Sequence, residues 1–85
     1  MQATLTHPVS GDVATVALDR GHVLSWTCAG KERLFLSAKA EMQAGEGALA
    51  AIRGGIPLCW PQFAGRGPLP KHGFARTTGA WQLQV

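Results

Sequence analysis

The sequence has no acidic residue after Glu46, although the basic residues Arg53, Arg66, Lys71 and Arg76 follow it. No apolar run approaches the ~20 residues that a membrane-spanning helix needs. The first residues hold neither a basic stretch nor a long apolar one, so nothing indicates secretion. Cys28 and Cys59 form no C-x-x-C motif and no common metal-ligand spacing. These absences predict a reduced, cytoplasmic protein with no metal site and no membrane partner.

The composition is that of one small globular domain at most. The chain has 85 residues, of which 46% are hydrophobic and 15% charged, which excludes a highly charged disordered tail. A chain this short buries only ~60–65% of the surface that it exposes when unfolded, so a lone core is marginal. The formal net charge is +3. The basic residues after Glu46, which have no acidic residue among them, form a candidate anion site. The alternative is a solvated loop with scattered cations.

Alternating apolar and polar residues predict short strands in the first half of the chain. These are residues 3–6, 12–18, 22–28 and 33–37, with turns at 19–21 and 29–31. The pattern favours an antiparallel meander. Residues 38–51 predict a loop with at most one helical turn, and residues 80–85 predict a strand. No turn closes that last strand, which indicates that residues 1–85 are a single partial domain.

Residues 53–79 differ from the rest because six of them are glycine and four are proline. Only residues 56–60 could form a strand, and Pro57 limits it to an edge or a strand start. We therefore expect residues 61–73 to be a loop, and loops of this length inside compact domains are usually functional.

Two short runs within this segment are candidate binding motifs. In Arg53-Gly54-Gly55, the glycines allow the backbone to approach a ligand, and the guanidinium fits phosphate or carboxylate. The alternative is a turn with a solvent-facing arginine. If residues 73–76 are extended, His72, Phe74 and Arg76 share one face. The alternative there is an Arg–His surface pair beside a core phenylalanine.

For the other aromatic and titratable side chains we expect mainly structural roles. Trp60 either anchors its loop or offers a stacking platform for a sugar ring. The remaining ones are expected in the core (Trp26, Trp81 and Cys59), at the surface (His7) or in a structural role (His22).

The two runs, at residues 52–63 and 68–76, resemble the hallmark of the glucose-6-phosphate 1-epimerases. This family, also called D-hexose-6-phosphate mutarotases, is part of the galactose mutarotase-like superfamily. Residues 21–26 and 36–40 resemble the same family. The resemblance implies an all-β fold in which this chain forms the N-terminal part of an antiparallel β-supersandwich several times its length.

The resemblance also implies an activity, which is exchange between the α and β anomers of a hexose 6-phosphate. A general acid His and a general base Glu open and close the sugar ring, without metal or cofactor. Both lie in segments that this chain lacks, so we expect no catalytic residue in it. Its implied substrate residues are Arg53, which matches the phosphate-binding arginine, together with Lys71, His72 and Arg76.

The sequence departs from the family pattern at two places. Many relatives carry Gln where Lys71 stands, and they often have Gly directly after the phenylalanine, where this chain has Ala64.

The expected partner is a small sugar phosphate, together with the missing C-terminal part of the domain. A non-catalytic sugar-phosphate-binding module or a truncated remnant remains an alternative. Nucleic acid is not expected, because the charge is modest and no exposed aromatics alternate with the cations.

Overall fold

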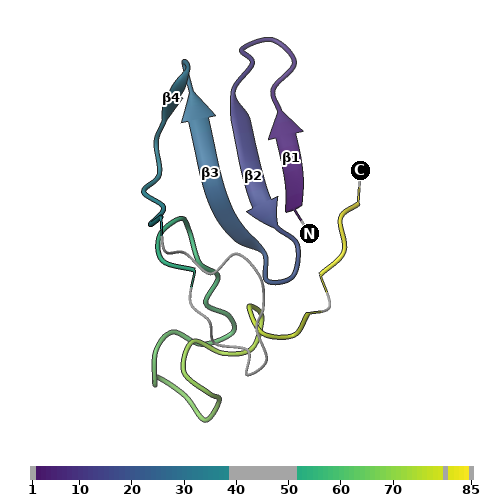
Figure 1. Ribbon diagram of the computed structural model, residues 1–85. Helices are drawn as coiled ribbons and strands as arrows, with labels where there is room; N and C mark the ends of the chain where they lie inside the picture. Colours follow the sequence, from purple (N-terminus) through teal and green to yellow (C-terminus); the bar gives the residue numbers. More distant parts are fainter. Residues whose placement is uncertain (1, 39–51, 80, 85) are drawn as a thin grey trace.

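The computed structural model describes residues 2–38, 52–79 and 81–84, and within them it contains strands and loops. Four strands follow one another along the chain and across one antiparallel sheet (Figure 1). They are β1 (Gln2–Thr6), β2 (Val13–Ala17), β3 (His22–Cys28) and β4 (Lys31–Glu32). The predicted all-β class and the antiparallel meander are confirmed.

The first three strands lie where alternation predicted them, but the pairing of β2 with β3 contains an irregularity. The register passes from Thr15 opposite Ser25 to Val16 opposite Val23, which leaves Leu24 as an extra residue of β3. A bulge of this kind bends the strand and interrupts regular alternation. Leu24 is 2% exposed whereas Trp26 is 45% exposed. The prediction that Trp26 belongs to the core is therefore wrong for this structure.

The fourth strand is shorter and earlier than predicted. Lys31 and Glu32 pair with Cys28 and Thr27, whereas residues 33–37 form no strand. The carboxylate of Glu32 accepts hydrogen bonds from the amides of Trp26 (3.1 Å) and Leu34 (3.3 Å), which would otherwise be available for a longer ladder. A further bond from the Ser25 hydroxyl is the main reason that the pKa of Glu32 is lowered.

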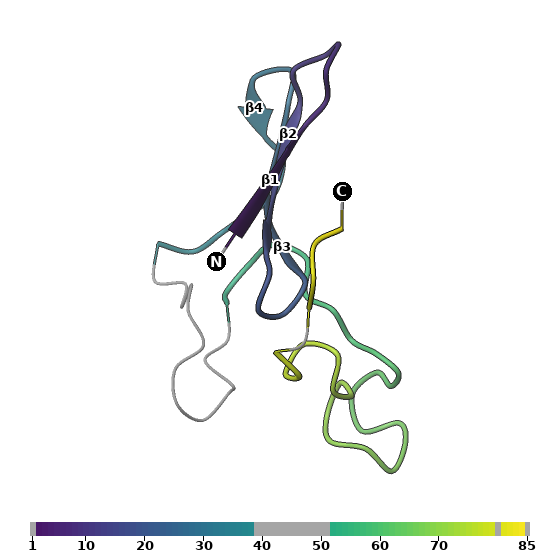
Figure 2. The same ribbon diagram turned by 90° about the vertical axis from the view of Figure 1, so that its right-hand side faces the viewer.

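Residues 52–79 lie beyond the end of the sheet at which β2 ends and β3 begins (Figures 1 and 2). Isolated bridges connect Val23 with Ile56 and Leu36 with Gly54. Residues 61–73 contain only one bridge residue, Gly73, so the predicted loop is confirmed. Of the predicted loop 38–51, residues 39–51 lie outside the described residues.

The predicted last strand is not found, since residues 81–84 have no strand pairing; Ala80 and Val85 lie outside the described residues. The indole of Trp81 instead donates its Nε1–H to the Ala75 carbonyl oxygen at 2.7 Å. A Cβ on Gly21 would lie 3.1 Å from the Trp81 ring, which places the ring against the β2–β3 turn. Trp81 remains 41% exposed, so its predicted core position is also wrong.

The core is small and lies where the sheet meets the loops. Ala17, Leu24 and Ile52 form its buried cluster, and Leu36 packs against it. Full burial of a leucine or isoleucine side chain is worth about 1.5–3 kcal/mol. The described core therefore joins β2 and β3 to the start of the loop region, which is the part of the fold that positions the candidate site. Within the described residues, no helix is suited to span a membrane.

Candidate functional site

The first arm of the candidate site is the turn that carries Arg53. Ser37 donates its amide to the Arg53 carbonyl oxygen at 2.9 Å, and Gly55 donates to Phe35 at 2.7 Å. Val23 and Ile56 exchange backbone hydrogen bonds of 3.1 and 2.9 Å. The turn is thus fixed to the sheet on both sides of Arg53, while the Arg53 residue itself is exposed.

His22 holds the same turn from the sheet. It is 5% exposed, and its Nε2–H donates to the Gly54 carbonyl oxygen at 2.7 Å. A backbone carbonyl only accepts, so the proton must be on Nε2. The expectation of a structural role for His22 agrees with this bond, but sequence analysis did not connect it with Arg53. The two residues are joined by a contact that spans 32 positions of the chain.

The two glycines of this turn serve close packing against the sheet. Gly54 and Gly55 have φ angles of +110° and +66°, which side chains disfavour. A Cβ at Gly54 would collide with the Phe35 carbonyl oxygen, and one at Gly55 with the Val23 carbonyl oxygen. The Gly55 amide, which was a candidate anion donor, is already bound to Phe35. The glycines therefore bring the turn close to the protein backbone, and the guanidinium of Arg53 is the group left to meet a ligand.

The second arm is the loop at residues 61–73, which a buried amide side chain holds. The Nε2 of Gln62 lies within hydrogen-bond distance of the carbonyl oxygens of Ala64 (2.7 Å) and Leu69 (3.1 Å). Its Oε1 accepts from the Leu69 amide at 3.0 Å. The Gln62 side chain thus joins the two limbs of the loop, the first of which contains Ala64 and the second Leu69. Sequence analysis did not single out Gln62, because nothing in the local pattern distinguishes it from an exposed glutamine.

His72 closes the loop at its far end. Its Nδ1 accepts the Ala64 amide at 3.0 Å, and its own amide donates to the Ala64 carbonyl oxygen at 3.1 Å. Because Nδ1 accepts, the neutral ring carries its proton on Nε2. Both residues have left-handed backbones, with φ +50° at Ala64 and +66° at His72. Ala64 thus adopts the conformation that glycine favours at the position where the family often has glycine.

Residues 73–76 are not extended, so the condition for one shared face is not met. The amides of Phe74 and Ala75 both donate to the Trp60 carbonyl oxygen, at 3.0 and 3.1 Å, and Thr77 donates to Phe74 at 3.0 Å. The chain therefore turns here, and alternation does not place His72, Phe74 and Arg76 on one face. Phe74 is also exposed.

Three of the predicted site residues influence one another electrostatically. Desolvation lowers the pKa of His72 below its ordinary value of 6.5, and the charges of Arg76 and Lys71 lower it further. Coulomb effects of this kind need charges within several ångströms. We call Lys71, His72 and Arg76 the 71–76 cluster, in which Lys71 and Arg76 carry the positive charge that acts on His72. Arg53 belongs to the other arm, and within the described residues no hydrogen bond or ion pair joins it to this cluster.

The cations of both arms lack carboxylate partners in the described part of the chain. There, the ion pair is that of Arg20 with Asp19, at 3.1 Å, on the β2–β3 turn. The described residues also contain no group of three His, Cys, Asp or Glu side chains that could hold a metal ion. The arrangement is suited to binding an anion, because cationic donors that are not already paired can bind it without first breaking an ion pair.

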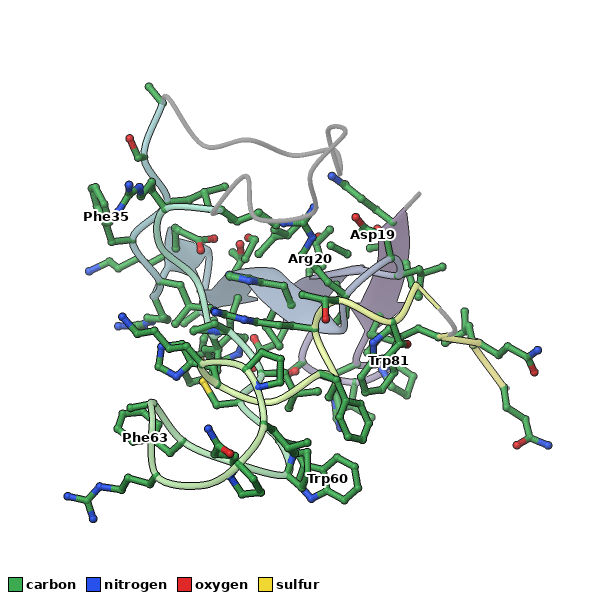
Figure 3. The ribbon with its side chains drawn as sticks, turned by 90° about the horizontal axis from the view of Figure 1, so that it is seen from below. Asp19, Arg20, Phe35, Trp60, Phe63 and Trp81 are labelled. Carbon is green, nitrogen blue, oxygen red and sulfur yellow. The ribbon has the colours of Figure 1, made fainter. Side chains whose placement is uncertain are left out.

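Exposed aromatic rings lie beside these cations. Trp60 and Phe74 meet edge to face, with ring centroids 5.7 Å apart, and Phe63 lies 5.3 Å from the His72 ring. Figure 3 shows Trp60 and Phe63 on the loops. Trp60 is 59% exposed, so much of its surface is available for contact with a ring such as a sugar. Cys59, expected to be buried, is half-buried and free.

Comparison with curated proteins gives three relatives, each named "putative glucose-6-phosphate 1-epimerase". The Escherichia coli K12 protein is 46% identical over 74 residues, which are 84% of this chain and 24% of the relative. The Salmonella typhimurium protein is 43% identical over 75 residues, 85% of this chain and 24% of the relative. The protein of the plant Cenchrus ciliaris is 50% identical over 64 residues, 74% of this chain and 18% of the relative. The chain thus spans about a quarter or less of their length.

A solved structure agrees with the sequence relatives. The crystal structure of a protein described as a putative mutarotase from Salmonella typhimurium superposes with a TM-score of 0.65 at 39% identity. The match covers 89% of this chain and 25% of that one. No family model matches the chain. The similarity in sequence and in fold confirms that this chain resembles one part of the glucose-6-phosphate 1-epimerase family, with its galactose mutarotase-like fold.

Proposed function

We propose that this chain supplies the phosphate- and sugar-binding loops of a glucose-6-phosphate 1-epimerase, which exchanges the α and β anomers of a hexose 6-phosphate. The observation that carries the proposal is the set of cations Arg53, Lys71 and Arg76. They lie on loops fixed to the sheet or closed by buried side chains, and have no carboxylate partner among the described residues.

The phosphate is the part of the substrate that these loops recognise. A phosphate monoester carries a charge of about −1.5 to −2 at neutral pH. Arg53 and Arg76 offer planar forks of N–H donors, and Lys71 offers a point charge. Binding energy from the phosphate, remote from the reacting carbon, holds the sugar ring in place for the reaction.

The sugar ring meets His72 and the aromatic side chains beside it. With Nδ1 occupied by the Ala64 amide, the neutral imidazole has its Nε2–H left to donate to a sugar oxygen. Desolvation, and then the charges of Arg76 and Lys71, lower the pKa of His72 and so favour its neutral ring, which serves as a hydrogen-bond donor to the substrate. The proton transfers of ring opening would come from groups in the part of the relatives' length that this chain does not span.

Binding and catalysis are tested separately. In titrations of the 85-residue chain followed by amide NMR, we expect glucose 6-phosphate to bind at least tenfold more tightly than glucose. Equal affinity for the two sugars would contradict the proposal. A chimera in which residues 1–85 replace the matched segment of the Escherichia coli relative should accelerate anomer exchange, as measured by exchange NMR.

The second candidate function is a non-catalytic sugar-phosphate-binding module, which would use the same cations without carboxylate partners among the described residues. The two functions predict the same binding of glucose 6-phosphate, but they predict different rates of anomer exchange for the chimera. A chimera that folds and binds glucose 6-phosphate but leaves anomer exchange at the rate of buffer would favour the binding module. We expect the 85-residue chain alone to leave that rate unchanged, because it carries no catalytic acid or base.

A further inference from the structure

The loop that carries Lys71 and His72 has little backbone structure of its own. Its internal backbone hydrogen bonds are those from Arg66 to Phe63, from His72 to Ala64 and from Gly73 to Pro70, at 2.8–3.1 Å. None of them connects the middle of one limb to the middle of the other. A loop of this length loses considerable conformational entropy when it is ordered, so another group must hold its two limbs together.

Gln62 makes that connection from a buried position. It is 7% exposed, and its Nε2 lies 2.7, 3.1 and 3.4 Å from the carbonyl oxygens of Ala64, Leu69 and Pro70. Its Oε1 accepts the Leu69 amide at 3.0 Å. An amide has two N–H donors, so the two shorter contacts are the principal bonds and the third is shared. The carbonyl of Pro70 belongs to the residue directly before Lys71.

We propose that Gln62 is a positioning residue, which sets the place of Lys71 and His72 for the phosphate and the sugar without touching either. The inference rests on the proposed function, since it concerns the same site. Gln62 is buried among loop carbonyls, so its amide does not reach a ligand. Removing the amide leaves those carbonyls without their donor, and the limb that carries Lys71 keeps its bonds between His72 and Ala64 but loses those at Leu69 and Pro70.

Gly67 offers a way to disturb Gln62 without changing it. A Cβ at Gly67 would collide with Oε1 of Gln62, whereas a Cβ at Gly65 meets nothing within 4 Å. Neither glycine has a positive φ angle, so alanine is not strained at either position by the backbone. The far end of the Gln62 side chain can move away only by giving up its hydrogen bonds. Gly67→Ala and Gly65→Ala are therefore a matched pair, two residues apart in one loop.

The experiment measures the affinity of the 85-residue chain for glucose 6-phosphate and inorganic phosphate, and the titration of His72 by NMR without ligand. We expect Gln62→Met and Gly67→Ala each to weaken binding about tenfold, as expected when one charge-assisted contact is lost. Both should also raise the pKa of His72, because the ring leaves its desolvated position near Arg76 and Lys71. Gly65→Ala and Gln82→Met, at exposed positions, should match the wild type.

The outcomes separate this inference from the proposed function. If wild type binds glucose 6-phosphate but Gln62→Met and Gly67→Ala bind it equally well, Gln62 does not position the site and the inference is overturned alone. If Gln62→Met unfolds, Gly67→Ala decides, with the amides of β2 and β3 reporting that the sheet is intact. If wild type binds no phosphate, the proposed function fails, and an unchanged His72 titration in both variants would refute the positioning of the loop as well.

Discussion

Replacing Arg53 with alanine tests whether the loops recognise the phosphate or only the shape of the sugar. Arg53 is exposed on a turn held by backbone hydrogen bonds and by the imidazole of His22, none of which uses the Arg53 side chain, so the substitution leaves these bonds in place. The variant should therefore keep its fold and lose one phosphate ligand. The same argument applies to Arg76, with the difference that Arg76 is half-buried.

The expected loss follows from the strength of a charge-assisted hydrogen bond. Such bonds are worth roughly 1.5–3 kcal/mol, and 1.4 kcal/mol corresponds to about tenfold in affinity. Arg53→Ala should therefore weaken glucose 6-phosphate binding by about 10- to 150-fold, towards the lower end because exposed charges are screened by salt. Arg53→Lys should recover only part, since an ammonium cannot form the bidentate fork. Lys71→Gln should cost less, because relatives carry Gln there.

The assay compares affinities for glucose 6-phosphate and for glucose in each variant, at low and at physiological salt. Arg33→Ala is the matched control, because Arg33 is exposed, directly follows β4 and donates its amide to Trp26 of β3 rather than to the loop region. We expect it to bind glucose 6-phosphate as the wild type does. If Arg53→Ala loses glucose and glucose 6-phosphate by the same factor, Arg53 shapes the loop and does not bind the phosphate.

Three further substitutions or conditions test how the loops are held. Ala64→Gly should raise the urea midpoint, because its φ of +50° costs alanine about 1 kcal/mol, whereas Ala14→Gly in β2 should lower it. His22→Ala should weaken glucose 6-phosphate binding, because the bond to Gly54 is lost; His7→Ala, at an exposed site, should not. The folded loop takes up a proton at His72 less readily than the unfolded chain, so loop stability should be constant above the ordinary pKa of 6.5 and fall as the pH drops through the lower folded-state pKa. Hydrogen exchange of the Ala64 amide measures this, and equal protection at pH 5 and pH 8, after correction for intrinsic rates, would contradict it.

The strands were predictable where local pattern and tertiary structure agree. In residues 22–28, alternation and the preceding Asp19-Arg20-Gly21 turn mark a strand, and β3 has those bounds. The errors lie where a side chain binds backbone groups that a strand would use. Glu32 accepts amides that residues 33–37 would need for a strand, and Trp81 bonds to Ala75 where a last strand was expected. Neither contact has a local sequence signal.

In the site, too, features of the local sequence could be predicted and contacts between residues far apart in the sequence could not. The cationic residues could be predicted, because an arginine beside two glycines and a block without carboxylates are visible in the sequence. The side chains that hold them could not. His22 reaches Gly54 across 32 positions, and Gln62 reaches Leu69 across seven. Their roles depend on how the loops fold back, which composition and spacing do not specify.

These holding residues couple the register of the sheet to the geometry of the site. His22 begins β3 opposite Ala17, and Val23 next to it bridges to Ile56 just after the Arg53 turn. A slip of one residue between β2 and β3 would move every side chain of β3 to the other face, and His22 would no longer face Gly54. The bulge at Leu24 lies between this end of β3 and the rest of the strand, so it sets which face His22 occupies. The position of Arg53 is therefore determined by strand pairing that involves none of the residues expected to bind substrate.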